Sequence, residues 1–328
     1  MKAKVKAFIT RYGMIKRGDK VLCALSAGAD SMAMVMLLKE LSKEMGFEVA
    51  AAHFIHGIRP EEAEKEKNLA KNLCEELGIE FRFEEGDTLK YCKEHKLGTE
   101  DGARRLRYEF LERTARGLKA DKIATAHNKN DNAETVLLNL IRGSGMRGLS
   151  GIPPVRDNII RPVMCLSRQE IEQYLGEREY AKDATNYTLD YTRNKIRHKL
   201  LPLVEEINDR GIDNISLAGL RLREENDFIE SETEKTVGTC SFENGVISAD
   251  IKQLKKLSPG LLKRVIHRLY EKAGGDMGKL CSVHIDSVAD LVYNKLPPKY
   301  IVMPSGIRMR LKNKKLLIYN GECEDKIC

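Results

Sequence analysis

Short apolar runs alternate with amphipathic stretches along the first half of the chain. The apolar runs predict strands over 21–25, 49–53, 79–83 and 122–126, and apolar residues at helical spacing predict helices between and after them. Strands that alternate with helices form right-handed βαβ units. We therefore expect an α/β fold with a doubly wound, mostly parallel sheet. Such a sheet binds its ligands at the carboxyl ends of its strands.

The hydrophobic pattern changes near residue 211. A long charged helical stretch, SLAGLRLREENDFIESETEKTVG, is followed by helices predicted near 261–272 and 283–293. In the final segment Ile307, Met309 and Leu311 alternate with arginines, which predicts a half-buried strand in a hairpin. We therefore expect two domains, a sheet domain over 1–210 and, over 211–328, a linker helix with a smaller α+β domain.

A turn of small residues, SAGADS over 26–31, follows the first predicted strand. Such a turn brings backbone amides together at the start of a helix, where the helix dipole favours an anion such as phosphate. The hydroxyls of Ser26 and Ser31 can add donors, and Asp30 can hold a magnesium ion that neutralises the phosphate. An ordinary turn with Asp30 or Ser31 as the helix cap explains the same residues equally well. The turn is not a Walker A loop, because the first lysine after it is Lys39.

A second group of polar residues follows the strand predicted over 122–126. His127, Asp131 and Glu134 are spaced so that they share one face if the helix begins early. Two carboxylates at a helix start can coordinate magnesium or bind an ammonium group, and a histidine there can contact a phosphate. By itself, the D-x-x-E spacing of Asp131 and Glu134 favours a helix capping box instead.

Two clusters of arginines are candidates for binding a polyanion. The arginines of RRLR over 104–107 lie on both sides of one predicted helix, so at least one of them is a solvated surface charge. Arg193, Arg197 and His198 form the second cluster, which suits the phosphate backbone of RNA. A basic helix face that stays in solvent explains the second cluster equally well.

The composition is that of a globular chain with a modest basic excess. Its 328 residues suffice for one large core and a second domain. The net charge of +7 is compatible with a polyanionic partner and also with a plain hydrophilic surface. Eight cysteines without a C-x-x-C pair indicate reduced thiols, and we find neither a signal peptide nor an apolar run that could cross a bilayer. We therefore expect a cytoplasmic protein without a membrane partner.

Taken in order, these segments resemble the bacterial tRNA(Ile)-lysidine synthases, a family of PP-loop ATP pyrophosphatases. The SAGADS turn is similar to the pyrophosphate-binding loop of that superfamily, Ser-Gly-Gly-x-Asp-Ser. The other matching motifs are H-F-I-H-G-I-R at 53–59, R-R-L-R-Y at 104–108, A-H-N-K-N-D-N-A-E-T at 126–135, R-G-S-G-M-R-G-L-S-G at 142–151, I-R-P at 160–162, D-A-T-N at 183–186 and R-N-K-I-R-H at 193–198.

The resemblance implies an ATP-dependent ligase that acts on a tRNA(Ile) with a CAU anticodon. In that family the keto oxygen of the wobble cytidine is adenylated with release of pyrophosphate, and the ε-amine of L-lysine then displaces AMP to leave lysidine. The resemblance also implies that the domain over 1–210 binds ATP and carries the catalytic residues, and we expect the part over 211–328 to help hold the tRNA. A homodimer is among the assemblies that it permits.

Residue roles follow from the same resemblance. The residues expected to hold the ATP phosphates are Ser26, Ala27, Gly28, Ala29, Asp30 and Ser31. Mg²⁺ would bind Asp30 and Asp131, and the metal or the lysine ammonium would bind Asp131 and Glu134. The residues expected to stabilise the adenylated intermediate are His127, Arg107 and Arg197.

Three residues depart from the family pattern, since Ala27 replaces a glycine, Asn128 a histidine and Asn132 a glutamine. If position 27 requires a positive φ, its alanine costs on the order of 1 kcal/mol.

Two other functions remain open. One is a tRNA thiolase of the same superfamily, which the missing C-x-x-C pair disfavours. The other is an inactive RNA-binding relative, which only Ala27 favours.

Overall fold

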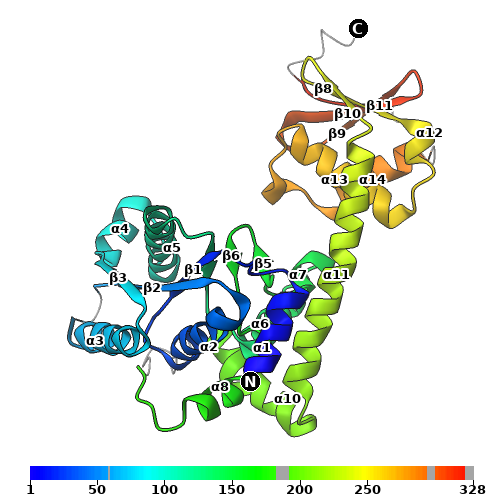
Figure 1. Cartoon of the computed structure of the whole chain (residues 1–328). Coiled ribbons are helices and arrows are strands. Elements are labelled where there is room, and N and C mark those ends of the chain that lie inside the picture. Colours follow the sequence, from blue (N-terminus) through cyan, green and yellow to red (C-terminus); the bar gives the residue numbers. More distant parts are fainter. Residues whose placement is uncertain (58–59, 182–191, 294–299, 322–328) are drawn as a thin grey trace. The chain divides into compact units, whose positions relative to one another are not determined.

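The structure, a computed structural model, describes residues 1–57, 60–181, 192–293 and 300–321 (Figure 1). The D-A-T-N motif at 183–186 and the last two residues of the motif at 53–59 lie outside the described residues. The chain divides into two compact units, Met1–Arg223 and Glu224–Cys328. Helix α11 (Gly211–Val237) begins in the first unit and ends in the second.

A six-stranded sheet in the order β3-β2-β1-β4-β6-β5 forms the centre of the first unit. Neighbouring strands run parallel except β5 and β6, which are antiparallel. The predicted α/β fold with a mostly parallel sheet is therefore confirmed. Its strands are β1 (Lys20–Ala24), β2 (Glu48–Ile55), β3 (Glu80–Glu85), β4 (Lys122–Ala124), β5 (Val155–Arg156) and β6 (Ile159–Ile160).

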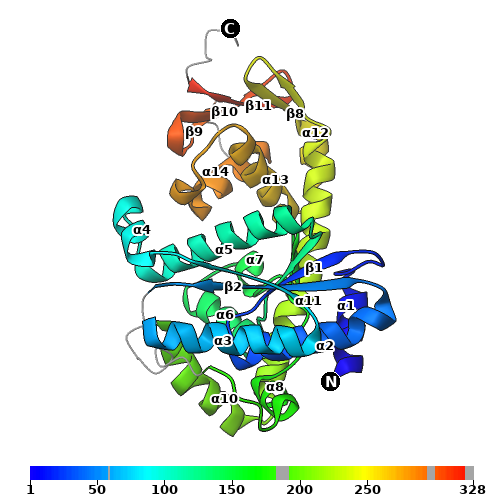
Figure 2. The same cartoon turned by 60° about the vertical axis from the view of Figure 1, so that its left-hand side comes forward.

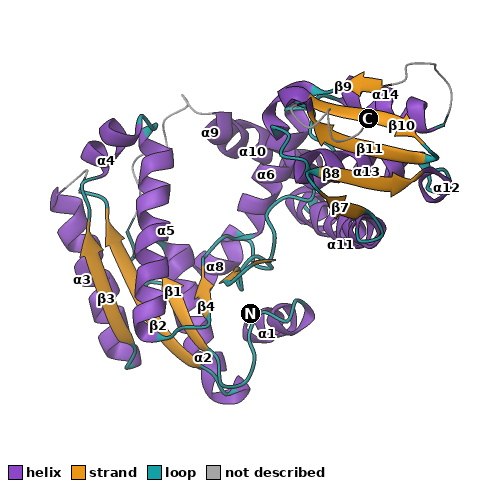
Figure 3. Cartoon of the chain, turned by 90° about the horizontal axis from the view of Figure 1, so that it is seen from above, coloured by secondary structure: helices purple, strands orange, loops and turns teal. Residues whose placement is uncertain are grey.

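Helices cover both faces of this sheet, as expected for a doubly wound fold. Helices α2 and α3 lie on one face and α5 on the other (Figure 2, Figure 3). The helical elements are α1 (Lys2–Arg11), α2 (Ala29–Met45), α3 (Pro60–Leu77), α4 (Thr88–His95), α5 (Thr99–Leu118), α6 (Lys129–Ile141), α7 (Met146–Leu149), α8 (Arg168–Leu175), α9 (Thr192–Lys195), the π-helical turn η2 (Ile196–Leu200) and α10 (Leu201–Ile207).

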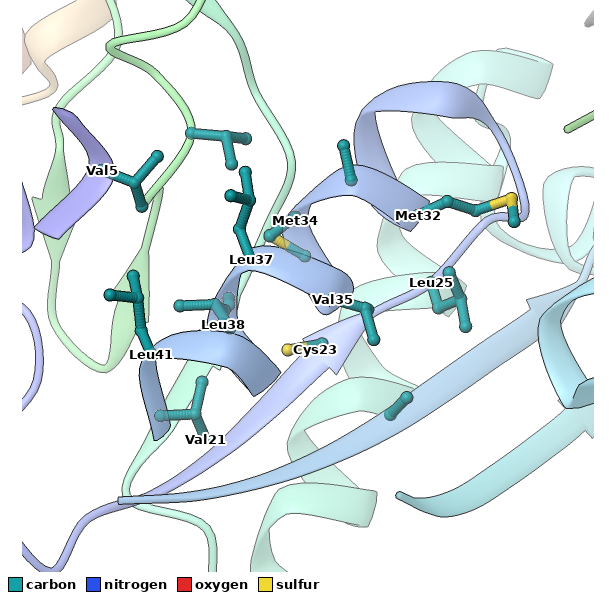
Figure 4. Close-up of a cluster of buried hydrophobic side chains, with 14 of the residues drawn as sticks. Val5, Val21, Cys23, Leu25, Met32, Met34, Val35, Leu37, Leu38 and Leu41 are labelled. Atoms are coloured by element: carbon teal, nitrogen blue, oxygen red, sulfur yellow. The ribbon is translucent and has the colours of Figure 1, made fainter. Parts of the chain in front are cut away.

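Strand β1 is buried along its whole centre because both faces of the sheet are covered. Val21 and Cys23 belong to the core on the side of α2, and Leu22 belongs to the core on the side of α5. Figure 4 shows Leu38 and Leu41 of α2 packed beside β1. This packing fixes the start of α2, and with it the loop that connects β1 to α2.

The second unit has its own hydrophobic core, between an antiparallel sheet in the order β7-β8-β11-β10-β9 and the helices α13 and α14. The predicted hairpin is confirmed, since Asn313 and Lys314 both have positive φ, as a type I′ turn requires. Its elements are β7 (Ser241–Glu243), β8 (Val246–Asp250), α12 (Ile251–Leu254), α13 (Pro259–Lys272), η3 (Met277–Lys279), α14 (Ser282–Val292), β9 (Tyr300–Val302), η4 (Pro304–Gly306), β10 (Ile307–Lys312) and β11 (Lys315–Asn320).

Within the described ranges, no helix combines the length and the apolar character that crossing a bilayer requires.

The packing of α2 predicts a large effect of a cavity in the core between this helix and the sheet. Leu38→Ala should lower the free energy of unfolding by about 2–5 kcal/mol, because Leu38 is fully buried and the site cannot collapse completely. The matched control is Leu89→Ala in α4, since Leu89 is 52% exposed and its truncation should change the free energy by less than about 0.5 kcal/mol. Urea denaturation of both variants measures the difference, and equal effects would contradict this account of the core.

Candidate active site

The loop over 26–31 is closed by hydrogen bonds among its own residues. The Oγ of Ser31 accepts from the backbone amide of Ser26 at 3.1 Å and from the Ser26 hydroxyl at 3.2 Å, and it donates to the carbonyl of Gly28 at 2.9 Å. Helix α2 begins at Ala29 with Gly28 as its N-cap. The alternative in which Asp30 or Ser31 caps the helix is therefore wrong, and both residues lie in its first turn.

Ala27 adopts a left-handed backbone conformation, with φ of 60°. The neighbouring Gly28 has φ of −73°, so the position that favours glycine carries an alanine. Ala27 and Ala29 are buried, and their methyl groups belong to the core on the side of α2. The carbonyl of Ala27 accepts from the amide of Ala181 at 2.9 Å, which ties the loop to a distant segment.

Asp30 is the charged residue of the loop, and both of its carboxylate oxygens have partners. Oδ1 accepts from the Asn128 amide group at 2.9 Å, and Oδ2 accepts from Nη1 of Arg168 at 2.6 Å. Burial raises the pKa of the Asp30 carboxyl, while the charge of Arg168 and the hydrogen bond from Asn128 lower that pKa in part. The loop is thus joined to the start of α6 and to the start of α8.

Asp131 and Glu134 of α6 face two arginines from α9 and η2. Glu134 is fully buried and accepts from Nε of Arg193 at 3.0 Å and from Nε of Arg197 at 2.6 Å. Nη2 of Arg197 also donates to Asp131 at 3.0 Å. The second arginine cluster therefore turns Arg193 and Arg197 toward carboxylates, which neither interpretation of the sequence anticipated.

The capping box predicted for Asp131 and Glu134 is wrong. The N-cap of α6 is Asn128, whose side chain accepts from the amide of Asp131, while the Asp131 carboxylate accepts from the amide of Asn128. The helix therefore starts earlier than the D-x-x-E spacing indicated. Asp131 and Glu134 share one face of it, since both contact Arg197, whereas His127 lies before the helix.

Arg197 lies in an irregular helix turn. The amide of Leu201 donates to the carbonyl of Ile196, five residues earlier, which defines a π-helical turn. Pro202, which follows, has no amide and cannot donate to a carbonyl of the preceding turn. Arg193 and Arg197 are four residues apart, and both side chains donate to the carboxylate of Glu134.

His127 and Arg107 lie on the electropositive side of the site. The Nδ1 of His127 is 3.1 Å from the Thr125 hydroxyl. Burial lowers the pKa of His127 to about 4, Asp131 opposes the shift, and the charges of Arg161 and Arg107 add to it. Arg107 is half-buried, as expected for the member of its cluster that faces inward, while Arg104 and Arg105 are exposed.

Electrostatic interactions link several of these groups. The charge of Asp131 raises the pKa of Asp30, and the charge of Asp30 raises the pKa of Arg197 against the effect of burial. His127 belongs to the same group through Asp131. His53 is buried near the end of β2, and its Nδ1 donates at 2.8 Å to the carbonyl of Leu25, the residue before the loop.

The carboxylates fit a magnesium ion that arrives with a nucleotide. In the part of the chain that the structure describes, no three His, Cys, Asp or Glu side chains converge as a metal site would require. Mg²⁺ usually keeps several waters and binds through one or two carboxylates and the phosphates of a substrate. Asp30 in the first turn of α2, with Asp131 near it, provides that smaller donor set.

Two arginines of this site were not found from the sequence. Arg168 contacts Asp30, and Arg161 is buried, donating to the carbonyl of Pro153 at 2.6 Å. The S-x-x-E spacing of Ser167 and Glu170 is a capping-box signal that could have placed Arg168 at a helix start. The hydrophobic periodicity of the sequence does not indicate that α8 packs beside the loop over 26–31.

The remaining departures from the family pattern have structural partners. Asn128 caps α6 and binds Asp30, as described above. Asn132 is fully buried, donates to the hydroxyl of Ser216 at 3.0 Å and accepts from the amide of Ile152 at 2.8 Å. Asn132 therefore connects α6 to α11 and to the segment after α7.

Comparison with known proteins places these residues in a family. Residues 1–204 match the model of the PP-loop domain family. The chain is similar to a tRNA(Ile)-lysidine synthase of Clostridioides difficile (strain 630), with 36% identity over 325 residues that cover 97% of this chain and 70% of that protein. A tRNA(Ile)-lysidine synthase of Petrotoga mobilis is 37% identical over 255 residues, which cover 70% of this chain and 82% of that protein.

Among solved structures, the chain is similar to the U34-tRNA thiolase NcsA from Methanococcus maripaludis. The TM-score is 0.57 at 24% identity, and the match covers 68% of this chain and 78% of that one. At this identity the likeness concerns the fold.

The left-handed conformation of Ala27 predicts an unusual response to glycine. Ala27→Gly and Ala29→Gly each remove one buried methyl group, but only the first relieves a strained φ. We expect Ala29→Gly to lower the free energy of unfolding by about 1 kcal/mol, and Ala27→Gly to leave it unchanged within about 0.5 kcal/mol. Urea denaturation decides, and equal losses in the two variants would mean that Ala27 is not strained.

The depressed pKa of His56 predicts a pH dependence of stability. Burial lowers this pKa to about 4, with Arg107 and His53 adding to the shift, so between pH 4 and 6.5 the unfolded chain binds a proton that the folded chain does not. Stability should fall as the pH drops through this window. His56→Gln should reduce the loss of unfolding free energy between pH 7 and pH 5 by at most about 2 kcal/mol, measured by urea denaturation. An unchanged loss would refute the shift.

Proposed function

The chain belongs to the tRNA(Ile)-lysidine synthases, PP-loop ligases that use ATP, and from this premise we propose how its residues carry out the reaction. The substrates would be ATP, L-lysine and a tRNA(Ile) with a CAU anticodon. The observation that carries the proposal is the convergence of the loop carboxylate Asp30 with Asp131, Glu134 and Arg197. One site then holds groups suited to phosphates, to a cation and to a developing negative charge.

In the first step the keto oxygen of the wobble cytidine attacks the α-phosphorus of ATP. A new oxygen–phosphorus bond forms, the bond to the bridging oxygen breaks, and its electron pair leaves with pyrophosphate. The first turn of α2 has amides without helical carbonyl partners, and these would hold the phosphates together with the hydroxyls of Ser26 and Ser31. The backbone of Ala27, Gly28 and Ala29 would line the same cradle.

We propose that Asp30 and Asp131 bind Mg²⁺ together with the phosphates. When bound, the ion would neutralise charge on the phosphate oxygens. Arg107 and Arg197 would stabilise the negative charge of the adenylated intermediate. His127 is neutral at physiological pH because of its lowered pKa, so it can form a hydrogen bond with the intermediate without adding charge.

In the second step the lysine ε-amine attacks the activated carbon of the cytidine, the carbon–oxygen bond breaks, and AMP leaves. Asp131 is the carboxylate that the ammonium group can reach, since its side chain is 17% exposed and that of Glu134 is not exposed at all. Asp131 would hold the ammonium and accept its proton. Glu134 would act through Arg193 and Arg197, which it orients.

We further propose that residues 1–210 carry catalysis and that residues 211–328 help hold the tRNA, in a cytoplasmic enzyme. In β10, Ile307 and Met309 are buried in the core, so Arg308 and Arg310 alternate to the opposite face of the sheet. Both arginines are half-buried, and a sheet face with arginines suits a phosphate backbone.

The experiment that tests the function is incorporation of labelled lysine into tRNA transcripts with ATP and magnesium. We expect alkali-stable label on a CAU-anticodon tRNA(Ile) and none on tRNA(Met). Asp30→Ala should reduce tRNA-dependent pyrophosphate release by at least 100-fold, because the phosphates lose the carboxylate that holds their metal. Arg178→Gln is the matched control, since Arg178 pairs with Glu76, which is not part of the site.

The outcomes separate the rival functions. Pyrophosphate release without lysine incorporation would keep the adenylation step and assign another nucleophile, as in a thiolase. Neither product, with an active control enzyme alongside, would favour an inactive RNA-binding relative. Near-normal release by Asp30→Ala would remove Asp30 from the mechanism.

A further inference from the structure

Arg168 is built into the phosphate loop, although it follows Asp30 by 138 residues in the chain. It is the first residue of α8, and a capping box between Ser167 and Glu170 fixes the start of that helix. The Arg168 backbone amide donates to the side chain of Asn130 at 3.0 Å. Helix α8 contributes to the same hydrophobic core as α2. The capping box, the hydrogen bond to Asn130 and the shared core therefore hold the guanidinium beside the loop.

The guanidinium of Arg168 has two nitrogens bound to carboxylates and a third available. Nη1 donates to Asp30 at 2.6 Å and Nε donates to Glu172 at 2.7 Å. Nη2 donates to no group in the described part of the chain, and the side chain is 40% exposed. Two carboxylates thus orient the guanidinium while one of its donor nitrogens faces no protein acceptor.

The carboxylate of Asp30 cannot easily serve Arg168 and a metal ion at the same time. Both oxygens already accept hydrogen bonds, one from Asn128 and one from Arg168. A divalent cation on the same carboxylate would repel the guanidinium at close range. When Asp30 binds the metal of a metal–nucleotide complex, Arg168 must therefore pair with another anion. The nearest one would be the phosphate chain held by the loop.

We propose that Arg168 binds the pyrophosphate leaving group, holding Asp30 in the nucleotide-free protein and donating to the β- and γ-phosphate oxygens once Asp30 serves the metal. This rests on the proposed function only for the use of ATP. As the bridging oxygen takes the electron pair of the broken bond, the negative charge on pyrophosphate grows, and a guanidinium there stabilises it. Glu172 keeps the side chain near the loop during the exchange.

Binding of inorganic pyrophosphate in EDTA tests this assignment without metal, tRNA or lysine, because Nη2 of Arg168 can donate to a phosphate oxygen while Nη1 stays on Asp30. Isothermal titration calorimetry should show a dissociation constant at least tenfold weaker for Arg168→Gln than for the unaltered chain, because charge-assisted hydrogen bonds are lost. Arg168→Lys should retain part of the affinity, and Arg178→Gln should stay within about twofold, since Arg178 pairs with Glu76.

Asp30→Asn provides a second test, in which the affinity for pyrophosphate should change in the opposite direction. This change keeps the shape of the side chain but removes the charge that competes for Arg168, so metal-free pyrophosphate should bind more tightly. The Asp30→Asn variant also tests the role of Arg168 if Arg168→Gln does not fold, which thermal unfolding would reveal.

Several results would overturn the assignment. They are absence of pyrophosphate binding by the unaltered chain, equal binding by Arg168→Gln, or no gain in Asp30→Asn. If Arg168 only neutralised Asp30, adding Arg168→Gln to the Asp30→Asn variant would leave the affinity for metal-free pyrophosphate unchanged. Failure of lysine incorporation with normal results here would reject the proposed function and leave the role of Arg168 standing.

Discussion

The site depends on one constraint, that carboxylates taken out of water need cations beside them. Asp30, Asp131 and Glu134 are placed by α2 and α6, and the arginines that neutralise them come from α8, α9 and η2. Removing one partner of a buried ion pair is costly, because the remaining charge stays desolvated. The final geometry of the loop therefore depends on contacts with later segments of the first unit.

The charges of the site are arranged asymmetrically. On one side the carboxylates are matched by arginines, and on the other Arg107 and the buried Arg161 stand near histidines that burial keeps neutral. Within the described residues, Arg161 forms no ion pair, and its Nε has no hydrogen-bond partner. An uncompensated positive charge of this kind favours a phosphate-rich ligand over a neutral one.

The order of elements and the fold class could be predicted from sequence because the core strands and helices have strong periodicity. The loop was located for the same reason, since it interrupts an apolar run with small residues. The capping of α6 was predicted wrongly, because Asp131 is three residues from two different partners, Asn128 and Glu134, and spacing alone fits both pairs. Arg168 could not be found, because its role depends on tertiary packing of α8 that no local pattern records.

The π-helical turn over Ile196–Leu200 also limits how this chain can change length. A π turn holds one residue more than the α-helical path it replaces. Deleting a single residue there would restore a regular helix and rotate everything on one side of it by about 100° relative to the other. The helix would survive such a deletion, but Arg193 before the turn and Leu201 after it could no longer both keep their contacts with α6. In a lineage of related chains, the extra residue would therefore be a better marker of an intact site than helix content.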